Sequence, residues 1–434
     1  GYRRGVGPGD LAPGTLGGRG RARRPGSLYK SLRSGYCLPV RILLGTAAAF
    51  LAFLAFLAME ALAVRRDRKA VPLRIGVTGT RGKSSVTRLV AAALRGAGRR
   101  TLAKTTGSRP RLILPDGTER DVPRFGPVTI LEQKGLLRTA RAEGAEALVA
   151  EIMSVRPENQ EVESSGILGI RVCVVTNVRV DHESEQGSSR DDVARALARS
   201  VPRGGLVICT AGEDHPVLRE AVFRAGAELR IAPARIPEGL RPFLPALGYA
   251  EFEDNLCLAL ETCVALGLDG PSALRSMASA APDLGALRAW RWEEEGSPRV
   301  FVNAFAANDV ASTRAVLDRA LSGKPPYARA AGLLNLREDR GERTLQWLRV
   351  LEGGLPAPLE ELFVIGPQSE AVRRRLAALG VLCRRIRERD PEGILRSAAA
   401  DRTGEFWLVG MGNIAGPGAR IVEYCARRGG LYES

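Results

Sequence analysis

A glycine-rich segment near residue 80 has the composition and spacing of a loop that binds phosphate. The segment GTRGKS follows the apolar run 75–78 and opens a helical pattern over 84–95. Backbone N–H groups of such a loop point at phosphate oxygens, and the dipole of the following helix adds a favourable potential. Lys83 would reach the β- and γ-phosphates, and the Ser84 hydroxyl would ligate Mg²⁺. The residues predicted to bind ATP here are Gly79, Thr80, Arg81, Gly82, Lys83, Ser84 and Ser85.

Two polar side chains follow other strand-like runs. Glu151 comes after the run 147–150, and His182 comes after the run 171–178. Since the carboxyl ends of parallel strands converge, both side chains could approach a metal held by Ser84. Each residue is weak evidence alone, because a lone glutamate is usually solvated and a lone histidine is usually a loop residue. The sequence has only two histidines, so a metal must rely mainly on oxygen ligands.

The composition indicates a globular body with a basic N-terminal region. The chain has 434 residues, of which 45% are hydrophobic and 26% charged, values typical of two or three folded domains. Most of the net charge of +16 lies in residues 1–74, so the charge does not predict a nucleic-acid partner. The seven cysteines never form a CxxC pair, which favours free thiols in a reducing compartment.

An apolar segment near the N-terminus is long enough to span a membrane. Residues 42–59 carry no charge, and the span 42–64 would be about 33 Å long as a helix. We predict a basic disordered arm over 1–36, a transmembrane helix over 37–64 and a basic linker over 65–74. The competing interpretation is a signal peptide cleaved near residue 63. The length of the run and the ATP site favour a single-pass anchor in the cell membrane with a cytoplasmic body.

The rest of the chain alternates short apolar runs with helical patterns. This alternation predicts the α/β class, with a parallel sheet covered on both faces. We expect an ATP-binding domain over 75–290, a boundary within 283–298, and a Rossmann-like α/β domain over 298–434. The predicted strands are 75–78, 147–150, 171–178, 205–209, 229–232, 300–303, 330–336, 362–365, 381–383 and 406–409.

These motifs together resemble a known enzyme family. GTRGKS, the AE pair ending at Glu151 and TNVRVDH over 176–182 are similar to the Mur ligase superfamily, whose ATP-dependent members join an amino acid to a carboxylate. A larger set of segments resembles the CapB or PgsB type of poly-γ-glutamate synthase. The set is GTRGKSSVTRLV (79–90), AKTTGSRPR (103–111), EQK (132–134), FEDNLCLAL (252–260), APDLGALR (281–288), FVNAFAANDVAST (301–313), LNLREDRGERTLQ (334–346) and GMGNIAGPG (410–418). Peptidoglycan Mur ligases carry a further domain before the phosphate loop, for which residues 65–74 leave no room.

The resemblance implies a role for individual residues. The catalytic residues would be Lys83, Glu151, His182 and Arg288. Ser84, Glu151 and His182 would hold Mg²⁺, Asn255 would contact the adenine region, and Arg288 would reach the ATP phosphates. Many Mur ligases use a carbamylated lysine as a metal bridge, but this chain has no lysine between Lys134 and Lys324, which excludes such a bridge.

The second domain would complete the site. Asn303, Asn308 and Asp309 fall where the superfamily has a nucleotide-contacting acidic motif, but Asn303 replaces the usual first aspartate, which puts the ribose contact in doubt. Arg337, Asp339 and Arg340 could bind the anionic amino acid or chain end, since arginine pairs with carboxylates through two hydrogen bonds. A salt-bridged loop is the competing interpretation of these three residues.

The favoured function is a membrane-anchored, Mg-ATP-dependent amide ligase. By resemblance it would polymerise glutamate into poly-γ-glutamate through an acyl phosphate, together with small membrane subunits and without nucleic acid. One alternative is another Mur-like or folylpolyglutamate-type ligase with a different acceptor. The other is a membrane-anchored P-loop ATPase that drives polymer assembly or export without forming a bond.

Overall fold

The computed structural model describes most of the chain beyond residue 27. The described residues are 28–107, 109–124, 128–180, 183–245, 247, 251–305, 316–318, 321, 323–338, 341–356 and 358–432. The chain divides into two contact units, Gly1–Ala63 and Val64–Ser434.

Helix α1, Leu28–Ala70, forms the described part of the N-terminal unit and continues into the second one. Its segment from Val40 to Ala70 is long and apolar enough to cross a membrane by length and composition. The helix is longer than the predicted span 37–64, because it takes in residues 28–36 of the predicted arm and residues 65–70 of the predicted linker. The helix is rich in leucine, alanine, arginine and lysine, which are good helix formers, and it continues through Pro39. It ends at Ala70, because Pro72 disfavours the helical conformation of Val71.

The end of α1 is held by the body of the protein. The Arg68 Nε donates to the carbonyl of Ile167 at 2.6 Å. Asp67 is buried and pairs with Arg141, with 2.8 Å between Oδ1 and Nε. Asp67 and Arg68, which follow the apolar run, therefore make structural contacts.

The first sheet has eight strands in the order β4-β3-β2-β5-β1-β6-β7-β8. Its bounds are β1 Leu73–Thr78, β2 Thr101–Thr105, β3 Arg111–Ile113, β4 Glu119–Asp121, β5 Ala147–Glu151, β6 Val172–Val175, β7 Leu206–Thr210 and β8 Glu228–Ala232. Every neighbouring pair from β2 to β8 is parallel, as the alternation predicted. The sequence did not predict β2, whose short run TLAKT contains a lysine. It also did not predict β3 and β4, which pair in an antiparallel manner at the edge and have only three residues each.

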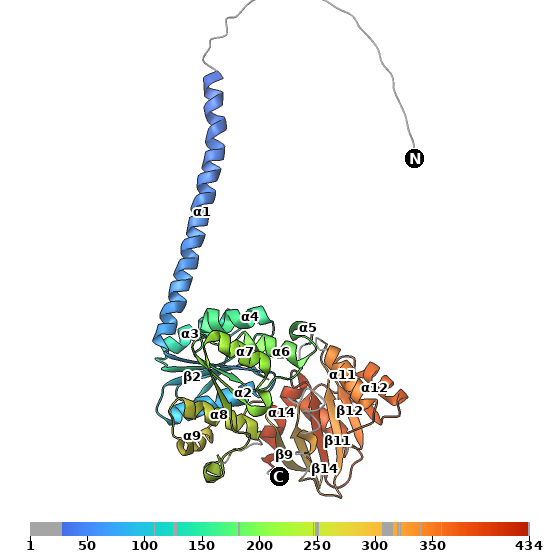
Figure 1. Cartoon of the computed structure of the whole chain (residues 1–434). Coiled ribbons are helices and arrows are strands. Elements are labelled where there is room, and N and C mark those ends of the chain that lie inside the picture. Colours follow the sequence, from blue (N-terminus) through green and yellow to red (C-terminus); the bar gives the residue numbers. More distant parts are fainter. Residues whose placement is uncertain are drawn as a thin grey trace, which may run out of the picture. The chain divides into compact units, whose positions relative to one another are not determined.

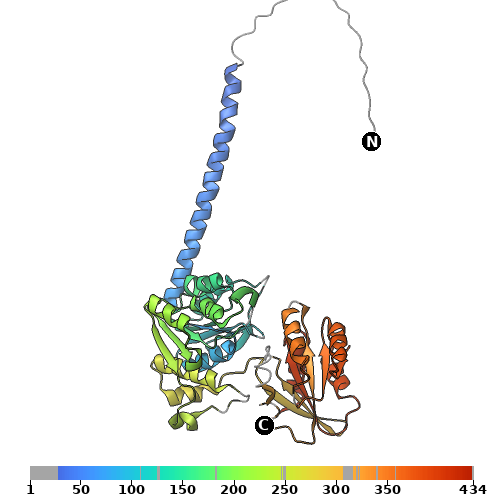
Figure 2. The same ribbon diagram turned by 45° about the vertical axis from the view of Figure 1, so that its right-hand side comes forward.

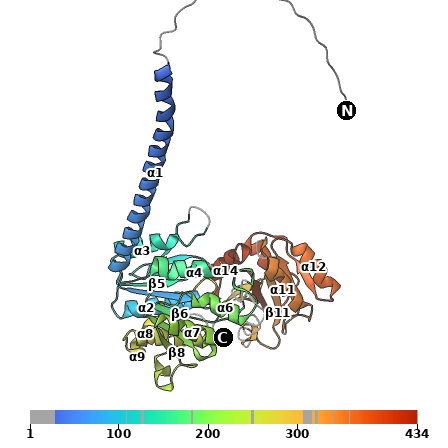
Figure 3. The same ribbon diagram turned by 45° about the horizontal axis from the view of Figure 1, so that its top comes forward.

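Helices cover both faces of this sheet (Figure 1). One face packs against α2 Lys83–Gly96, α8 Glu253–Ala265 and α9 Gly270–Met277. The other packs against α3 Glu132–Ala142, the π-helix η1 Val162–Leu168, α6 Arg190–Ala198 and α7 Pro216–Ala225. The short helices α4 Pro157–Glu161 and α5 Glu183–Gln186 precede η1 and α6, and single 3₁₀ turns lie at η2 Ala211–Glu213 and η3 Glu238–Phe243. Figure 3 shows α3 and α4 on the face of the sheet opposite α2 and α8.

The second sheet has seven strands in the order β13-β12-β11-β14-β10-β9-β15. Its bounds are β9 Arg288–Glu294, β10 Ser297–Asn303, β11 Arg329–Asn335, β12 Glu361–Ile365, β13 Cys383–Arg385, β14 Phe406–Gly412 and β15 Gly430–Leu431. The helices after residue 340 are α11 Gly341–Leu351, α12 Ser369–Ala378, α13 Pro391–Ala399 and α14 Pro417–Arg428. They lie on both sides of the sheet (Figure 2), since one core cluster contains α11 and α12 residues and another contains α13 and α14 residues.

Strand β9 lies in the segment that the sequence predicted as a boundary. It pairs with β10 in an antiparallel manner through a tight turn in which Glu295 and Gly296 have φ of 51° and 70°. The sequence did not predict this strand, because the charged residues Arg291, Glu293 and Glu294 interrupt its apolar pattern. A strand can carry such charges when one of its faces is exposed. As a result Arg288 opens a strand, and its Cα lies in register with that of Asn303.

Candidate active site

The glycine-rich loop joins β1 to α2, as the motif predicted. Gly79 has a φ of 127° and Gly82 a φ of 76°, conformations that residues with a Cβ rarely adopt. A Cβ at Gly79 would clash with the Thr176 hydroxyl and lie 3.0 Å from the backbone N and O of Asn177. Both glycines are therefore required by backbone conformation and by close packing.

Asn177 holds the loop in place. Its side-chain Oδ1 accepts from the backbone N–H of Arg81 at 2.9 Å, and its Nδ2 donates to the carbonyl of Arg81 at 3.0 Å. The Thr80 N–H donates to the Asn177 carbonyl at 3.3 Å. The asparagine of the TNVRVDH segment is thus a loop-holding residue, a role that the sequence analysis did not assign to it.

Lys83, Ser84 and Ser85 form the first turn of α2. The Lys83 Nζ donates to the carbonyl of Gly79 at 2.7 Å, so the ammonium lies over the loop. The Ser84 hydroxyl donates to Glu151 Oε2 at 2.8 Å, and the backbone N–H of Thr106 donates to the same oxygen at 2.7 Å. The predicted meeting of Ser84 with the carboxylate at the end of β5 is present in the structure.

The Ser84 and Glu151 pair fits a divalent cation. Mg²⁺ prefers oxygen ligands and often binds through one or two carboxylates together with substrate phosphates. His182, the third predicted ligand, lies outside the described residues. Within the described part of the chain, no cluster of three or more His, Cys, Asp or Glu side chains is placed to hold a metal ion.

Asn255 lies against the loop. It is buried near the start of α8, and a Cβ added to Gly82 would be 2.5 Å from its Oδ1. Its Nδ2 donates to Glu251 Oε1 at 2.7 Å. The structure therefore places Asn255 beside the phosphate loop, while the predicted adenine contact remains a prediction.

The segment before β9 also approaches the loop. A Cβ at Gly107 would clash with Ser84 Oγ and would lie 3.4 Å from Asp283 Oδ2. Asp283 therefore brings a second carboxylate to the neighbourhood of Ser84, which the sequence analysis missed because a lone aspartate in a Pro/Gly-rich segment carries no signal.

Arg288 and Asn303 lie side by side on β9 and β10. The Arg288 guanidinium lies 5.3 Å from the ring centre of Trp290, and burial lowers the pKa of Arg288. Asn303 is 0% exposed, and its Nδ2 donates to the carbonyls of Leu284 and Ala286 at 2.8 and 3.0 Å. Its side chain thus secures the segment that leads to Arg288, while its predicted nucleotide contact stays a prediction.

The remaining predicted residues belong to the second domain. Arg337 is half-buried and follows the end of β11. Asn308, Asp309, Asp339 and Arg340 lie outside the described residues.

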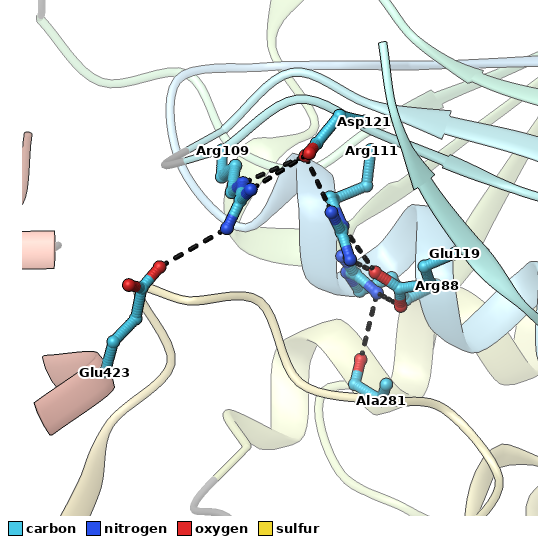
Figure 4. Close-up of polar contacts among 7 residues, drawn as sticks. All are labelled: Arg88, Arg109, Arg111, Glu119, Asp121, Ala281 and Glu423. Carbon is cyan, nitrogen blue, oxygen red and sulfur yellow. Dashed lines mark hydrogen bonds and ion pairs between the residues drawn. The ribbon is translucent and has the colours of Figure 1, made fainter. Parts of the chain in front are cut away.

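A chain of ion pairs anchors α2, the helix that begins in the phosphate loop (Figure 4). Arg88 is 3% exposed and binds both carboxylate oxygens of Glu119 on β4, while its Nη1 also donates to the Ala281 carbonyl at 3.3 Å. Arg111 joins Glu119 to Asp121, with Nε 3.1 Å and Nη1 2.6 Å from the two carboxylates. The short β3–β4 hairpin, which the sequence did not predict, therefore stabilises the position of α2.

The network continues through Arg109. Its Nε and Nη2 each lie 2.9 Å from a different oxygen of Asp121, and its Nη1 lies 3.3 Å from Glu423 Oε1 of α14 (Figure 4).

Comparison with known proteins assigns the chain to a family. Residues 77–225 match the Mur ligase middle domain, and residues 290–428 match the poly-gamma-glutamate synthase CapB C-terminal domain. The chain is 33% identical to PGA synthase CapB of Bacillus subtilis over 317 residues, which cover 72% of this chain and 79% of that protein. The chain belongs to the CapB family. It is also 33% identical to the capsule biosynthesis protein CapB of Bacillus anthracis over 64% of this chain, and this match spans only 60% of that relative.

Solved structures with the same fold come from related ligases. Escherichia coli FolC in complex with ADP has a TM-score of 0.64 at 17% identity, and the match covers 88% of this chain and 97% of that one. A bifunctional folylpolyglutamate synthase/dihydrofolate synthase with Mn, AMPPNP and L-glutamate bound has a TM-score of 0.61 at 15% identity, covering 85% and 93% of the two chains. The predicted Mur-ligase-like α/β fold, the resemblance to CapB and the class of ATP-dependent amide ligase are thus confirmed at the level of the family.

Proposed function

We propose that this CapB-family chain is a membrane-anchored amide ligase that uses ATP and Mg²⁺ to extend poly-γ-glutamate. The observation that carries the proposal is the contact of 2.8 Å between Ser84 Oγ and Glu151 Oε2 at the end of a strained glycine loop. It brings together a phosphate-binding helix start and a metal-binding carboxylate. The bound Mn, AMPPNP and L-glutamate of the folylpolyglutamate synthase structure support the same ligand classes here.

In this proposal the loop residues bind and orient the nucleotide. The cation would be held by Ser84, Glu151 and His182. When bound, it would neutralise part of the negative charge of the ATP phosphates, and ATP would supply the phosphoryl group that is transferred. The start of α2 would face the phosphates, and Lys83 would balance the negative charge that develops on the transferring group. Arg288 would add a second positive charge from the start of β9.

The reaction would proceed in two steps. A terminal carboxylate oxygen of the growing chain attacks the γ-phosphorus, ADP leaves, and an acyl phosphate forms. The amine of the incoming glutamate then attacks the acyl carbon, inorganic phosphate leaves, and the amine nitrogen loses a proton as the amide forms. Arg337, Asp339 and Arg340 would bind the anionic amino acid or chain end, and Asn255, Asn308 and Asp309 would contact the nucleotide.

The proposed location of the protein in the cell rests on helix α1 and on its need for ATP. Residues 37–64, most of which lie in the candidate span Val40–Ala70, would anchor the chain in the cell membrane, with the catalytic body in the cytoplasm where ATP is available. Small membrane subunits would act with it, because a charged polymer that leaves the cell needs a route through the bilayer.

ADP release by membranes that contain the full chain and candidate partner subunits tests this function. We expect glutamate and short γ-glutamyl chains to stimulate release at least tenfold more than glutamine or alanine, and mass analysis to show products spaced by one glutamate. The Glu151→Gln variant should lose this activity, whereas Glu158→Gln, on the exposed face of α4, should keep it.

Three other outcomes would contradict the proposal in different ways. Equal rates with all amino acids, or rapid hydrolysis with none, would favour an ATPase for assembly or export. Glutamate-dependent addition to a folate or a nucleotide-sugar acceptor would favour another Mur-type ligase.

A further inference from the structure

A buried polar network brings together two sequence segments to which the proposed reaction gives no role. Lys104, from the AKTTGSRPR segment, is 1% exposed on β2. Its Nζ pairs with Glu132 and donates to Gln133 Oε1 at 3.2 Å, and both partners come from the EQK segment at the start of α3. Gln133 in turn donates through Nε2 to Glu163 of the π-helix η1.

Glu163 is a fully buried carboxylate that holds the loop after β5. Its Oε1 accepts from the backbone N–H of Met153 at 3.0 Å, and its Oε2 accepts from the backbone N–H of Ser154 at 2.9 Å. The Ser154 hydroxyl also donates to Oε2. Together with Gln133, four donors therefore converge on one side chain, which is the arrangement that stabilises an ionised carboxylate away from water.

Lys104 provides the positive charge of this network. Burial lowers the pKa of Lys104, while the hydrogen bond and charge of Glu132 and the charge of Glu163 act in the opposite direction. Arg124 also pairs with Glu132, at 3.1 Å. Removing the charge of Lys104 would leave the buried carboxylates of this network with less positive charge to compensate them, which is costly inside a protein.

The network contacts the backbone segments on both sides of Glu151, the carboxylate proposed to bind the metal. Lys104 on β2 is in register with Ala150 on β5, directly before Glu151. The Thr106 N–H, two residues after Lys104, donates to Glu151 Oε2, and Met153, whose N–H is held by Glu163, comes two residues after Glu151. The two backbone segments that position Glu151 are therefore both attached to the network.

We propose that Lys104, Gln133 and Glu163 are positioning residues that orient Glu151 toward Ser84 for metal binding. This inference rests on the proposed function, because it assumes that Glu151 binds the cation. The three residues would act through the ends of β2 and β5 and would touch neither nucleotide nor substrate. Supporting residues of this kind typically change metal affinity by about 10–100-fold when they are removed.

The test measures metal binding directly. Mn²⁺ binding to the full-length, detergent-solubilised protein saturated with AMPPNP is followed by electron paramagnetic resonance, and nucleotide binding is measured separately in EDTA. We expect Lys104→Met to weaken Mn²⁺ binding at least tenfold while nucleotide binding without metal changes less than twofold. Gln133→Leu replaces one neutral buried side chain with another and should weaken Mn²⁺ binding in the same direction even if Lys104→Met does not fold.

A matched control separates positioning from general stability. Arg402→Met breaks the buried pair of Arg402 with Glu361 in the second sheet, and it should lower the thermal midpoint without changing Mn²⁺ affinity. Unchanged Mn²⁺ affinity in Gln133→Leu, or an equal loss in the Arg402→Met control, would overturn the inference. A failure of the proposed function would give a different result. The unaltered protein would bind Mn²⁺ and nucleotide but would not release ADP in response to glutamate.

Discussion

The brace on the phosphate-loop helix predicts a large loss of stability from one substitution. Arg88→Met would remove two contacts to Glu119 and one to the Ala281 carbonyl. Removing one partner of a buried ion pair typically costs about 3–5 kcal/mol, since the other charge stays buried. Glu119 keeps Arg111 at 3.1 Å and its side chain is 18% exposed, so we expect the lower end, about 3 kcal/mol.

Thermal unfolding of the full-length protein in detergent, followed by tryptophan fluorescence, measures this loss. For a domain of this size about 3 kcal/mol corresponds to a fall of roughly 6–12 °C in the midpoint. Arg224→Met, which breaks an exposed pair with Glu220 on α7, is the matched control and should change stability by less than about 0.5 kcal/mol.

A double variant examines the cause. If the penalty comes from the loss of the buried partner of Glu119, then Arg88→Met combined with Glu119→Gln should recover at least half of the lost stability. A fall in the midpoint no larger than that of the Arg224→Met control would refute the reasoning, and so would a double variant that is less stable than Arg88→Met alone.

Four further expectations follow from the site and the fold. Lys83→Ala should lower ADP release by roughly 100-fold or more, because it removes the cation over the loop while circular dichroism stays unchanged. Gly82→Ala should weaken ATP binding at least about tenfold, whereas Gly98→Ala, which has a similar φ of 78° but no atoms near the added Cβ, should leave ATP binding unchanged. Burial alone would raise the pKa of Glu119, but its two arginine partners outweigh burial and lower the pKa below 4.5. The stability that Glu119 contributes should therefore be complete above pH 4.5 and fall as the pH decreases through the lowered pKa; a thermal midpoint that stays constant as the pH is lowered from 4.5 would contradict this. Residues 42–64 should stay in the membrane, so protease added outside spheroplasts should leave the body intact, and external digestion would overturn the topology.

The sequence was sufficient to predict the elements whose signal is local. A strand, a glycine loop and a helix in succession predicted the β1–α2 segment, since the loop needs glycines at 79 and 82 for conformations that other residues avoid. Long β-branched runs identified the central parallel strands, because strands buried on both faces must be apolar. Glu151 was identified for the same reason, as a polar residue directly after such a run.

The sequence pattern did not predict elements and residue roles that depend on contacts between residues distant in the chain. The strands β3 and β4 are too short for a visible period, and β9 alternates charges because one face is exposed. The role of Asn303 also depended on the fold, since its amide meets carbonyls that precede β9 only when β9 and β10 pair.

The family and the glycine loop of the proposed nucleotide site could thus be predicted from residue types and their spacing along the chain. The tertiary structure alone decided what supports that site. Lys104 lies 28 residues from Glu132 in the chain, and Glu163 lies a further 30 from Gln133, yet their side chains form one buried network. Charged residues at such separations look like solvated surface residues in a sequence. Only the packing of β2, α3 and η1 removes them from water, and burial makes each charge dependent on its partners.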